Sequence, residues 1–431
     1  MTRSRKGVTT GALFVLGLSL VAPQATAAGF ALFEQGARGM GFAGAFTAQS
    51  SDPSAIFHNA AGIAFLKGRQ FYLGGTLVNP STSFTGENPY PGAGRLEDQN
   101  VGATPFPSLY YTQALSDRLV IGAGLHVPFG LKTEWQNPET FTGRYISTRA
   151  QLKGFALNPT IAYKLADRFA IGGGLDIRFT SVQLDRFVPA VNPFTLSLVD
   201  VATVGLTSDT ATDFGFNLGV LAKPSESWSV GASYRHKVKQ DYAGAATFTL
   251  LPTGNAQFDT IVSQTLPSGA VPVTTSVAYP SLFSVGLAYK WNDWTFEGDA
   301  NYYGWSSFDT LPITIENRPE LSSIVEENYS NVWQFRFGAE RVLNEVWSVR
   351  GGYFFDKTPS PVESVSPLLP DASRNGFAAG ATWRSGRLRV DGASWYVKSK
   401  ARSTEGVNRD QFDGTYESSA LTLGLSLGWS F

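Results

Sequence analysis

The sequence predicts an all-β fold: a fourteen-stranded antiparallel transmembrane β-barrel with an N-terminal hatch, or plug, inside its lumen. Three observations lead to this fold. Segments with a period of two cover most of the chain, their connections alternate between short turns and long loops, and many tryptophans lie beside the short turns. An even strand number with short turns at one end and long loops at the other is typical of outer-membrane barrels.

The composition argues against several classes of function, namely nucleic-acid binding, thiol chemistry and metal binding. The 431 residues include 45 Gly, 3 His and no Cys, and the formal net charge is −1. A near-neutral chain offers no strongly basic surface for nucleic acid. The lack of cysteine excludes disulfides and thiol chemistry, and three scattered histidines do not predict a metal site. We therefore expect no metal, no cofactor and no nucleic-acid partner.

Residues 1–27 have the pattern of a signal peptide. A basic start from Arg3 to Lys6 precedes an apolar stretch over 11–22, and Ala25-Thr26-Ala27 is a small-residue cleavage site. No later segment approaches the roughly eighteen consecutive apolar residues of a membrane helix. We expect an exported chain that crosses its membrane with strands.

The barrel is predicted over residues 70–431, where large apolar residues alternate with small or polar ones. The last segment is the clearest case, with apolar residues at Leu421, Leu423, Leu425, Leu427, Trp429 and Phe431. The polar faces carry Gly, Ser, Asn and mixed charge rather than the lysines of a wet sandwich surface, which suits a lumen. Fourteen segments share the pattern: 70–80, 105–115, 119–129, 147–164, 168–187, 211–223, 227–250, 277–291, 293–307, 330–341, 345–357, 374–385, 386–401 and 416–431.

The connections and the tryptophans indicate which end of the barrel is which. Long loops are expected over 81–104, 130–146, 188–210, 251–276, 308–329, 358–373 and 402–415, with short turns between them. Six tryptophans lie near a short turn or the C-terminus and on the apolar face: Trp228, Trp291, Trp294, Trp347, Trp383 and Trp429. Tryptophans at one depth predict an interfacial aromatic girdle, with both chain ends on the periplasmic side.

Residues 28–69 break the strand pattern and are rich in Gly and Ala. A disordered periplasmic extension is one interpretation. A hatch folded into the lumen is favoured, because a closed sheet of fourteen strands has an interior wider than its own side chains fill.

An ordered set of short motifs resembles the FadL family of outer-membrane transporters for fatty acids and other hydrophobic compounds. The stretch Ala28-Gly29-Phe30 is similar to the family's mature N-terminus. Residues 52–62, DPSAIFHNAAG, resemble the plug segment with its Asn-Pro-Ala motif, although Ala60 stands in place of the proline. Residues 128–144, which contain PFGL, TEW and GR in that order, resemble the segment that follows the third strand in this family. The terminal Phe431 is similar to the aromatic residue read by the barrel-assembly machinery.

The resemblance implies passive transport of a hydrophobic small molecule, with long-chain fatty acids as the first expectation. Ligand would be captured at extracellular loops, enter an apolar pocket touched by Phe30, and leave sideways through a kink in strand three, 119–129. The hatch motif would lie at Asn59 and Ala61. The lateral opening would involve Gly122, Gly124, Pro128, Phe129 and Gly130, residue types that weaken strand pairing. We expect a monomer in the outer membrane of a Gram-negative bacterium, in contact with lipid and lipopolysaccharide.

Several alternatives stay open. Aromatic hydrocarbons or alkanes could replace fatty acids as substrates, because apolar pockets discriminate weakly among apolar shapes. A general aqueous porin is disfavoured by the hatch. An outer-membrane acyl-chain enzyme is disfavoured by the lack of a Gly-x-Ser-x-Gly elbow, since the run with this spacing, residues 424–428, falls inside an alternating strand segment. Apolar clusters in 187–199 and 361–370 predict either a capture surface or loops that pack on their neighbours. The lumenal arginines could hold a carboxylate, but nearby acids predict structural ion pairs for Arg178, Arg235, Arg336, Arg350 and Arg389.

Overall fold

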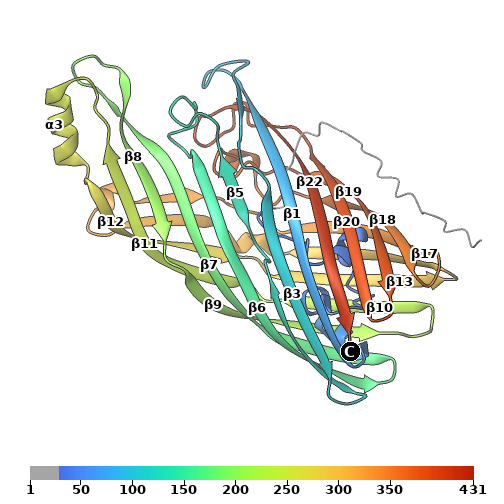
Figure 1. The fold of residues 1–431 in the computed structure, drawn as a ribbon. Coiled ribbons are helices and arrows are strands. Elements are labelled where there is room, and N and C mark those ends of the chain that lie inside the picture. Colours follow the sequence, from blue (N-terminus) through green and yellow to red (C-terminus); the bar gives the residue numbers. More distant parts are fainter. Residues whose placement is uncertain (1–28) are drawn as a thin grey trace, which may run out of the picture.

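The computed structural model describes residues 29–431, so the expected signal segment, 1–27, lies outside the described residues. Strands dominate and form one closed antiparallel barrel of tilted strands (Figure 1). The ring closes where β1 (Arg69–Gly86) pairs with β22 (Gly414–Ser430), from Gln70 opposite Ser430 to Gly86 opposite Gly414. The predicted fold class is confirmed. Within residues 29–431, no helix has the length and apolarity needed to cross a membrane.

Fourteen of the strands form the wall. In ring order they are β1, β3 (Thr104–Ala114), β4 (Leu119–His126), β6 (Arg149–Ala166), β7 (Phe169–Val191), β9 (Ala211–Ala222), β10 (Trp228–Arg235), β13 (Leu282–Trp291), β14 (Trp294–Tyr303), β17 (Val332–Val342), β18 (Trp347–Asp356), β19 (Arg374–Ser385), β20 (Leu388–Ser399) and β22.

The remaining elements are short strands beyond the wall and a few helices. The strands are β2 (Leu96–Asp98), β5 (Leu131–Glu134), β8 (Leu198–Ser208), β11 (Val238–Leu250), β12 (Gly269–Tyr279), β15 (Thr310–Ile315), β16 (Ser323–Glu326) and β21 (Arg402–Ser403). The helices are α1 (Ala37–Gly41), α2 (Ala55–His58) and α3 (Ala256–Thr265), with 3-10 turns η1 (Ala60–Phe65), η2 (Trp305–Ser307), η3 (Pro319–Leu321) and η4 (Val362–Ser364).

One sector of the long-loop end differs from the prediction. The expected loop 188–210 contains the end of β7 and all of β8, and the expected strand 227–250 is broken between β10 and β11. The expected loop 251–276 contains α3 and the start of β12. These strands continue the ladder above the wall (Figure 1, upper left), because β8 pairs with β7 and β11, and β11 with β12. Pairing with a neighbour satisfies backbone groups that a loop would leave to water.

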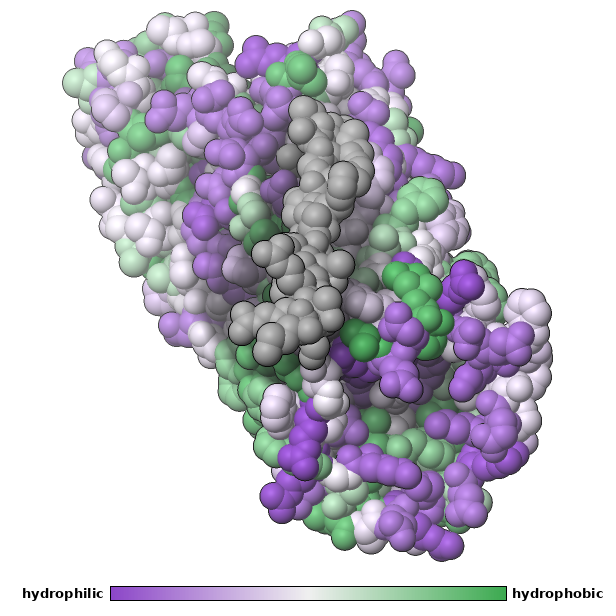
Figure 2. Space-filling model, turned by 45° about the vertical axis from the view of Figure 1, so that its right-hand side comes forward, coloured by the Kyte–Doolittle hydropathy of each residue, from purple (hydrophilic) through white to green (hydrophobic). Residues whose placement is uncertain are grey.

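The strands present an apolar outer face and a polar inner face, as their alternation predicts. In β22, the side chains of Leu421, Leu423, Leu425 and Leu427 are 37–57% exposed, whereas Thr422 and Ser426 are 1% exposed. Hydrophobic side chains form patches between hydrophilic ones on the face shown in Figure 2. Trp228, Trp291, Trp347 and Trp429 also lie on the outer face beside the short turns, at 42–56% exposure. This surface matches a lipid environment with an aromatic girdle.

The N-terminal segment, residues 29–68, lies within the ring of strands (Figure 1). Its helix α1 packs on β19, β20 and β22, and η1 packs on β6, β7 and β9 on the opposite side. Two carboxylates of β14 hold the turn between them. Asp299 accepts hydrogen bonds from the backbone N–H groups of Phe46 (2.9 Å) and Thr47 (3.0 Å), and Glu297 accepts from Ala48 (2.6 Å) and Gln49 (3.2 Å).

Candidate binding cavity and wall opening

Strand β4 stops at His126, well before the end of the predicted third strand at residue 129. Pairing between β3 and β4 ends at Leu109 opposite Leu125, and the chain resumes pairing with β6 only at Leu131, the start of β5. Pro128 lies in this interruption and has no N–H to donate to a ladder. The four residues from Val127 to Gly130 form a kink, which we call the β4 kink.

The β4 kink leaves part of the wall unpaired. Residues 104–108 of β3 and 153–155 of β6 have no hydrogen-bonded strand between them in the described chain. The interruption is bounded below by the Leu109–Leu125 pair and above by a bridge between Gln99 and Trp135. We call this window, flanked by 104–108 and 153–155, the wall opening.

The beginning of the N-terminal segment covers the β4 kink from inside. Leu32 donates its N–H to the carbonyl of Pro128 (2.9 Å), and Gly130 donates to the carbonyl of Phe30 (3.0 Å). Ala31 and Phe129 form an antiparallel bridge between these bonds. The backbone groups that β4 withdraws from β3 are therefore satisfied by residues 30–32 instead.

A cavity of about 540 Å³ connects the lumen to the wall opening. Val397 and Ala420 line its inner part, Phe106 lines it beside the wall opening, and Phe155 lines its outer part. Phe155 belongs to the outer face and is 45% exposed. Most of the lining is apolar, which is the lining a hydrophobic ligand requires. The cavity therefore extends from the barrel interior to the outer face of the wall.

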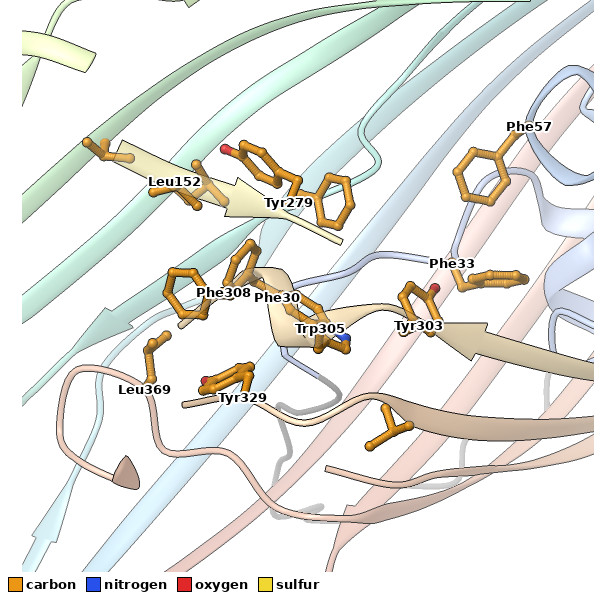
Figure 3. Packing of buried hydrophobic residues seen from close by; sticks show 14 of the residues in the cluster. Phe30, Phe33, Phe57, Leu152, Tyr279, Tyr303, Trp305, Phe308, Tyr329 and Leu369 are labelled. Atoms are coloured by element: carbon orange, nitrogen blue, oxygen red, sulfur yellow. The ribbon is translucent and has the colours of Figure 1, made fainter. Parts of the chain in front are cut away.

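Phe30 lies at the inner end of this cavity, within an aromatic cluster (Figure 3). Its ring centroid is 4.8 Å from that of Trp305, 5.4 Å from Phe308, 5.9 Å from Tyr279 and 6.1 Å from Phe129. The ring is 4% exposed. Phe30 thus contacts both the β4 kink and residues from two other parts of the chain.

A second, smaller cavity of about 50 Å³ lies on the other side of Phe30. Its walls are almost wholly apolar and include Leu311, Leu368 and Leu369 from the long loops. The expected apolar loop cluster at 361–370 therefore folds inward, since Leu368 and Leu369 are 7% and 8% exposed. The two cavities share Phe30, Leu131, Gln151 and Leu152, so they adjoin each other at these residues.

The structure separates the residues expected at the opening into two groups. Pro128, Phe129 and Gly130 form the β4 kink, whereas Gly122 and Gly124 lie in the paired part of β4 and face the hatch. A Cβ atom would lie 2.9 Å from Ile56 Cδ1 at Gly122 and 3.0 Å from Ile56 Cγ2 at Gly124. These two glycines leave room for the hatch and do not line the cavity.

The hatch motif is held against β9 of the wall. The Asn59 amide donates to the carbonyls of Thr47 and Val220, both at 2.9 Å, and its oxygen accepts from the Ala61 N–H at 3.1 Å. A Cβ atom at Gly219 of β9 would lie 2.1 Å from Asn59 Oδ1, so only glycine fits there. Asn59 also precedes η1 with extended backbone, although Ala60 replaces the proline of the family motif. The asparagine thus both caps η1 and ties the hatch to the wall.

The five lumenal arginines are all paired with carboxylates. Arg178 and Arg235 share Asp176, at 2.7 and 2.9 Å. The other three arginines also have acidic partners: Arg336 lies 3.1 Å from Asp356, Arg350 lies 2.6 Å from Glu340, and Arg389 lies 2.8 Å from Asp391. None of the five lines the 540 Å³ cavity.

Two charged residues of the cavity, Glu34 and Arg374, were missed by sequence reasoning. The signal available for Glu34 is that it is the only acid between residues 28 and 51. Burial raises the pKa of the Glu34 carboxyl, and attraction to Arg374 opposes that rise. Arg374 begins β19 where a long loop ends, and nothing in the local sequence sets it apart from other loop-end arginines.

The histidines of the interior do not form a catalytic arrangement with a nucleophile. His58 and His126 lie on two sides of the Phe57 ring, with centroid distances of 5.1 and 5.2 Å. Burial lowers the pKa of His58 to about 3, which keeps its imidazole neutral. Among residues 29–431, no group of three His, Cys, Asp or Glu side chains could hold a metal ion.

A closed barrel with an apolar outer face, a hatch in the lumen and an apolar cavity leading through the wall defines an outer-membrane transport protein. The chain belongs to the family described as outer membrane protein transport protein (OMPP1/FadL/TodX), which it matches over residues 18–431. The expected outer-membrane localisation and the transport class, as opposed to an enzyme, follow from this membership.

Curated relatives and solved structures agree with this membership. The long-chain fatty acid transport protein of Escherichia coli K12 is 24% identical over 99% of this chain and 100% of its own length. Outer membrane protein P1 of Haemophilus influenzae is 26% identical over 97% of this chain and 98% of its own length. A FadL homologue of Pseudomonas aeruginosa superposes with a TM-score of 0.82 at 21% identity, covering 94% of this chain and 100% of the other. The Pseudomonas putida toluene transporter TodX superposes with a TM-score of 0.73 at 18% identity, covering 93% of this chain and 99% of the other.

Proposed function

We propose that this protein carries long-chain fatty acids inward across the outer membrane and releases them sideways through the wall opening. The observation that supports this route most strongly is the 540 Å³ cavity, which is continuous from Phe30 in the lumen to Phe155 on the outer face. An acyl chain moving along it exchanges protein contacts for lipid contacts. Each CH2 group kept out of water contributes about 0.8 kcal/mol, so the dry path lowers the barrier to release.

The route begins at the long-loop end. Leu196 is 82% exposed and Phe194 is 52% exposed at the tip of the β7–β8 hairpin, which stands above the wall (Figure 1). These side chains offer a hydrophobic contact to a poorly soluble ligand outside the cell. The ligand then enters the small cavity beside Leu368 and Leu369, passes Phe30, and reaches the large cavity.

Phe30 and the β4 kink act together as the gate in this proposal. The two hydrogen bonds between residues 30–32 and 128–130 must break or slide for the segment to move aside. Each such bond contributes about 1 kcal/mol net, so thermal energy and a bound ligand suffice to open the segment. No energy-coupling step is needed because the ligand moves down its concentration gradient.

A second candidate function is uptake of uncharged aromatic hydrocarbons. The apolar lining of both cavities suits such ligands, and the toluene transporter TodX of Pseudomonas putida has a similar fold. A labelled hydrocarbon offered alongside a labelled fatty acid separates the two substrates.

The test of the route exploits the absence of cysteine from the chain. Phe106→Cys places a single thiol at the wall opening, and Phe337→Cys places one on the outer face of β17, where Phe337 is 54% exposed. Both variants are expressed in a Gram-negative host that lacks its own fatty-acid transporter. They are treated with a bulky membrane-permeant thiol reagent, and uptake of labelled oleate is measured.

We expect the reagent to block uptake through the Phe106→Cys variant and to leave the Phe337→Cys variant unchanged. Equal oleate uptake by the two variants after treatment with the thiol reagent would refute lateral release. The untreated wild-type chain is the second control. If it is present in the outer membrane and does not restore oleate uptake, the result would favour uncharged hydrocarbons as the substrates.

A further inference from the structure

Four charged side chains line the large cavity: Glu34, Lys132, Lys153 and Arg374. The Lys132 ammonium is already engaged, since its Nζ lies 2.9 Å from a Glu134 oxygen and donates to the Val101 carbonyl at 2.8 Å. Lys153 is exposed on the outer face. Arg374 is therefore the cation that a ligand meets inside the barrel.

Arg374 shares its carboxylate partner with another arginine. Its Nη2 lies 2.9 Å from Asp356 Oδ2, and the Nη2 of Arg336 lies 3.1 Å from Asp356 Oδ1. One fully buried carboxylate thus serves two guanidinium groups. The side chain of Arg374 keeps 14% of its surface accessible, whereas that of Arg336 keeps 1%.

Glu34 supplies the second negative charge to this pair of arginines. Its carboxylate attracts Arg374 most strongly and Arg336 next. Glu34 and Arg374 do not form one of the ion pairs within 4.0 Å found among residues 29–431, although both side chains line the same cavity. Arg374 is therefore not closed off by Glu34, and the accessible 14% of its side chain can meet a ligand carboxylate in this cavity.

We propose that Glu34 is a specificity residue for carboxylic acids: its charge balances that of Arg374 across the empty cavity, and a ligand carboxylate that binds Arg374 competes with it. This inference rests on the proposed function and names its substrate class, a long-chain monocarboxylate. Two carboxylates face two guanidinium groups in the empty cavity. A ligand anion adds a third carboxylate, and two anions beside one cation repel each other strongly in a poorly hydrated cavity. An uncharged ligand meets no such competition.

The position of Glu34 links ligand binding to the gate. Glu34 follows two residues after Leu32, whose N–H bonds to Pro128 of the β4 kink. The backbone carbonyl of Glu34 accepts from Thr76 Oγ1 of β1 at 3.1 Å, so the segment is held by β1 as well as by the β4 kink. A ligand acid that competes with the Glu34 side chain therefore acts on the segment that covers the β4 kink, whereas an alcohol of the same length does not.

The test compares binding of two ligands of equal chain length, palmitate and hexadecanol, to purified protein at pH 8. The proteins are the wild type, Glu34→Gln, and Glu345→Gln as a control that removes a carboxylate from an exposed short turn. Removing the competing charge is expected to tighten palmitate binding by Glu34→Gln about tenfold, equivalent to about 1.4 kcal/mol. Hexadecanol binding by Glu34→Gln, and binding of both ligands by Glu345→Gln, should match the wild type.

The outcomes separate this inference from the proposed function. Equal changes for palmitate and hexadecanol in Glu34→Gln would show that Glu34 only shapes the cavity, and unchanged palmitate binding would show that it does not compete; either result overturns the inference while the transport function stands. Binding of neither ligand to any of the proteins would overturn the proposed function and this inference with it.

Discussion

The two carboxylates of β14 provide the sharpest test of how the hatch is held. Asp299 and Glu297 together accept four backbone hydrogen bonds from residues 46–49, and no cation among the described residues forms an ion pair with either. Replacing both by alanine leaves four buried N–H groups without acceptors. Each unsatisfied group costs about 1–3 kcal/mol, so the hatch should lose on the order of 4 kcal/mol or more of its attachment to the wall.

A loss of this size raises the population of open hatch about a thousandfold, because each 1.4 kcal/mol is a factor of ten. We expect the Glu297→Ala/Asp299→Ala variant to fold as a barrel, with its usual heat-dependent gel mobility, and to conduct ions in a planar bilayer where the wild type does not. Cells expressing it should become sensitive to large hydrophilic antibiotics. The matched control is Asp241→Ala/Glu417→Ala, which removes two carboxylates that are exposed on their strands. Equal ion conductance in the two double variants would refute the role of Glu297 and Asp299 in anchoring the hatch.

Three further predictions concern the gate, the hatch contact and one loop. Phe30→Ala should join the two cavities and weaken ligand binding at least tenfold, measured by titration with a fluorescent fatty acid; unchanged affinity contradicts a gate at this ring. Gly219→Ala should push Asn59 from the wall, because its Cβ would lie 2.1 Å from Asn59 Oδ1, and make the hatch sensitive to protease in an intact barrel. Burial raises the pKa of the loop residue Glu327 from 4.5 to about 8. Its folded form therefore binds the proton more tightly, and loop stability falls as pH rises from 4.5 toward 8, by up to about 5 kcal/mol. Glu327→Gln should remove this loss, seen as slower hydrogen exchange in residues 323–331 at pH 9 after correction for intrinsic rates; equal exchange in both proteins counts against it.

Local pattern was enough to predict the wall. The alternation from Leu421 to Phe431 fixes which side chains face outward, because a strand has a period of two and only one face meets lipid. The tryptophans beside the short turns indicate which end of the barrel is periplasmic, because they lie at one depth on the outer face. Pro128 was informative too, since a residue without an N–H cannot donate to a ladder, although Pro80 and Pro159 lie within paired strands.

Long-range contacts account for what the sequence did not reveal. The pairing of residues 30–32 with 128–130 joins segments about a hundred residues apart, and neither has a strand pattern of its own. Glu34 and Arg374 meet only because the ring brings β19 beside the N-terminal segment. Gly122 and Gly124 resembled sites of weak pairing, but their small size serves the approach of Ile56, a contact that only the folded hatch reveals. The extension of β8 and β11 depends on neighbours that pair above the wall, which a single segment cannot show.

The closing ladder between β1 and β22 has a consequence for assembly. It joins the first and last strands of the chain, so the ring cannot close until the whole chain has been delivered to the membrane. The hatch precedes β1 in the sequence yet ends enclosed by strands from every part of the ring, including β14 and β22. A closed ring offers no side entrance for a segment of this size, so we expect the hatch to be seated while the sheet is still open. The N-terminal segment then serves as a core around which the curved sheet closes, and variants that detach it should slow closure and prolong the exposure of two unpaired strand edges.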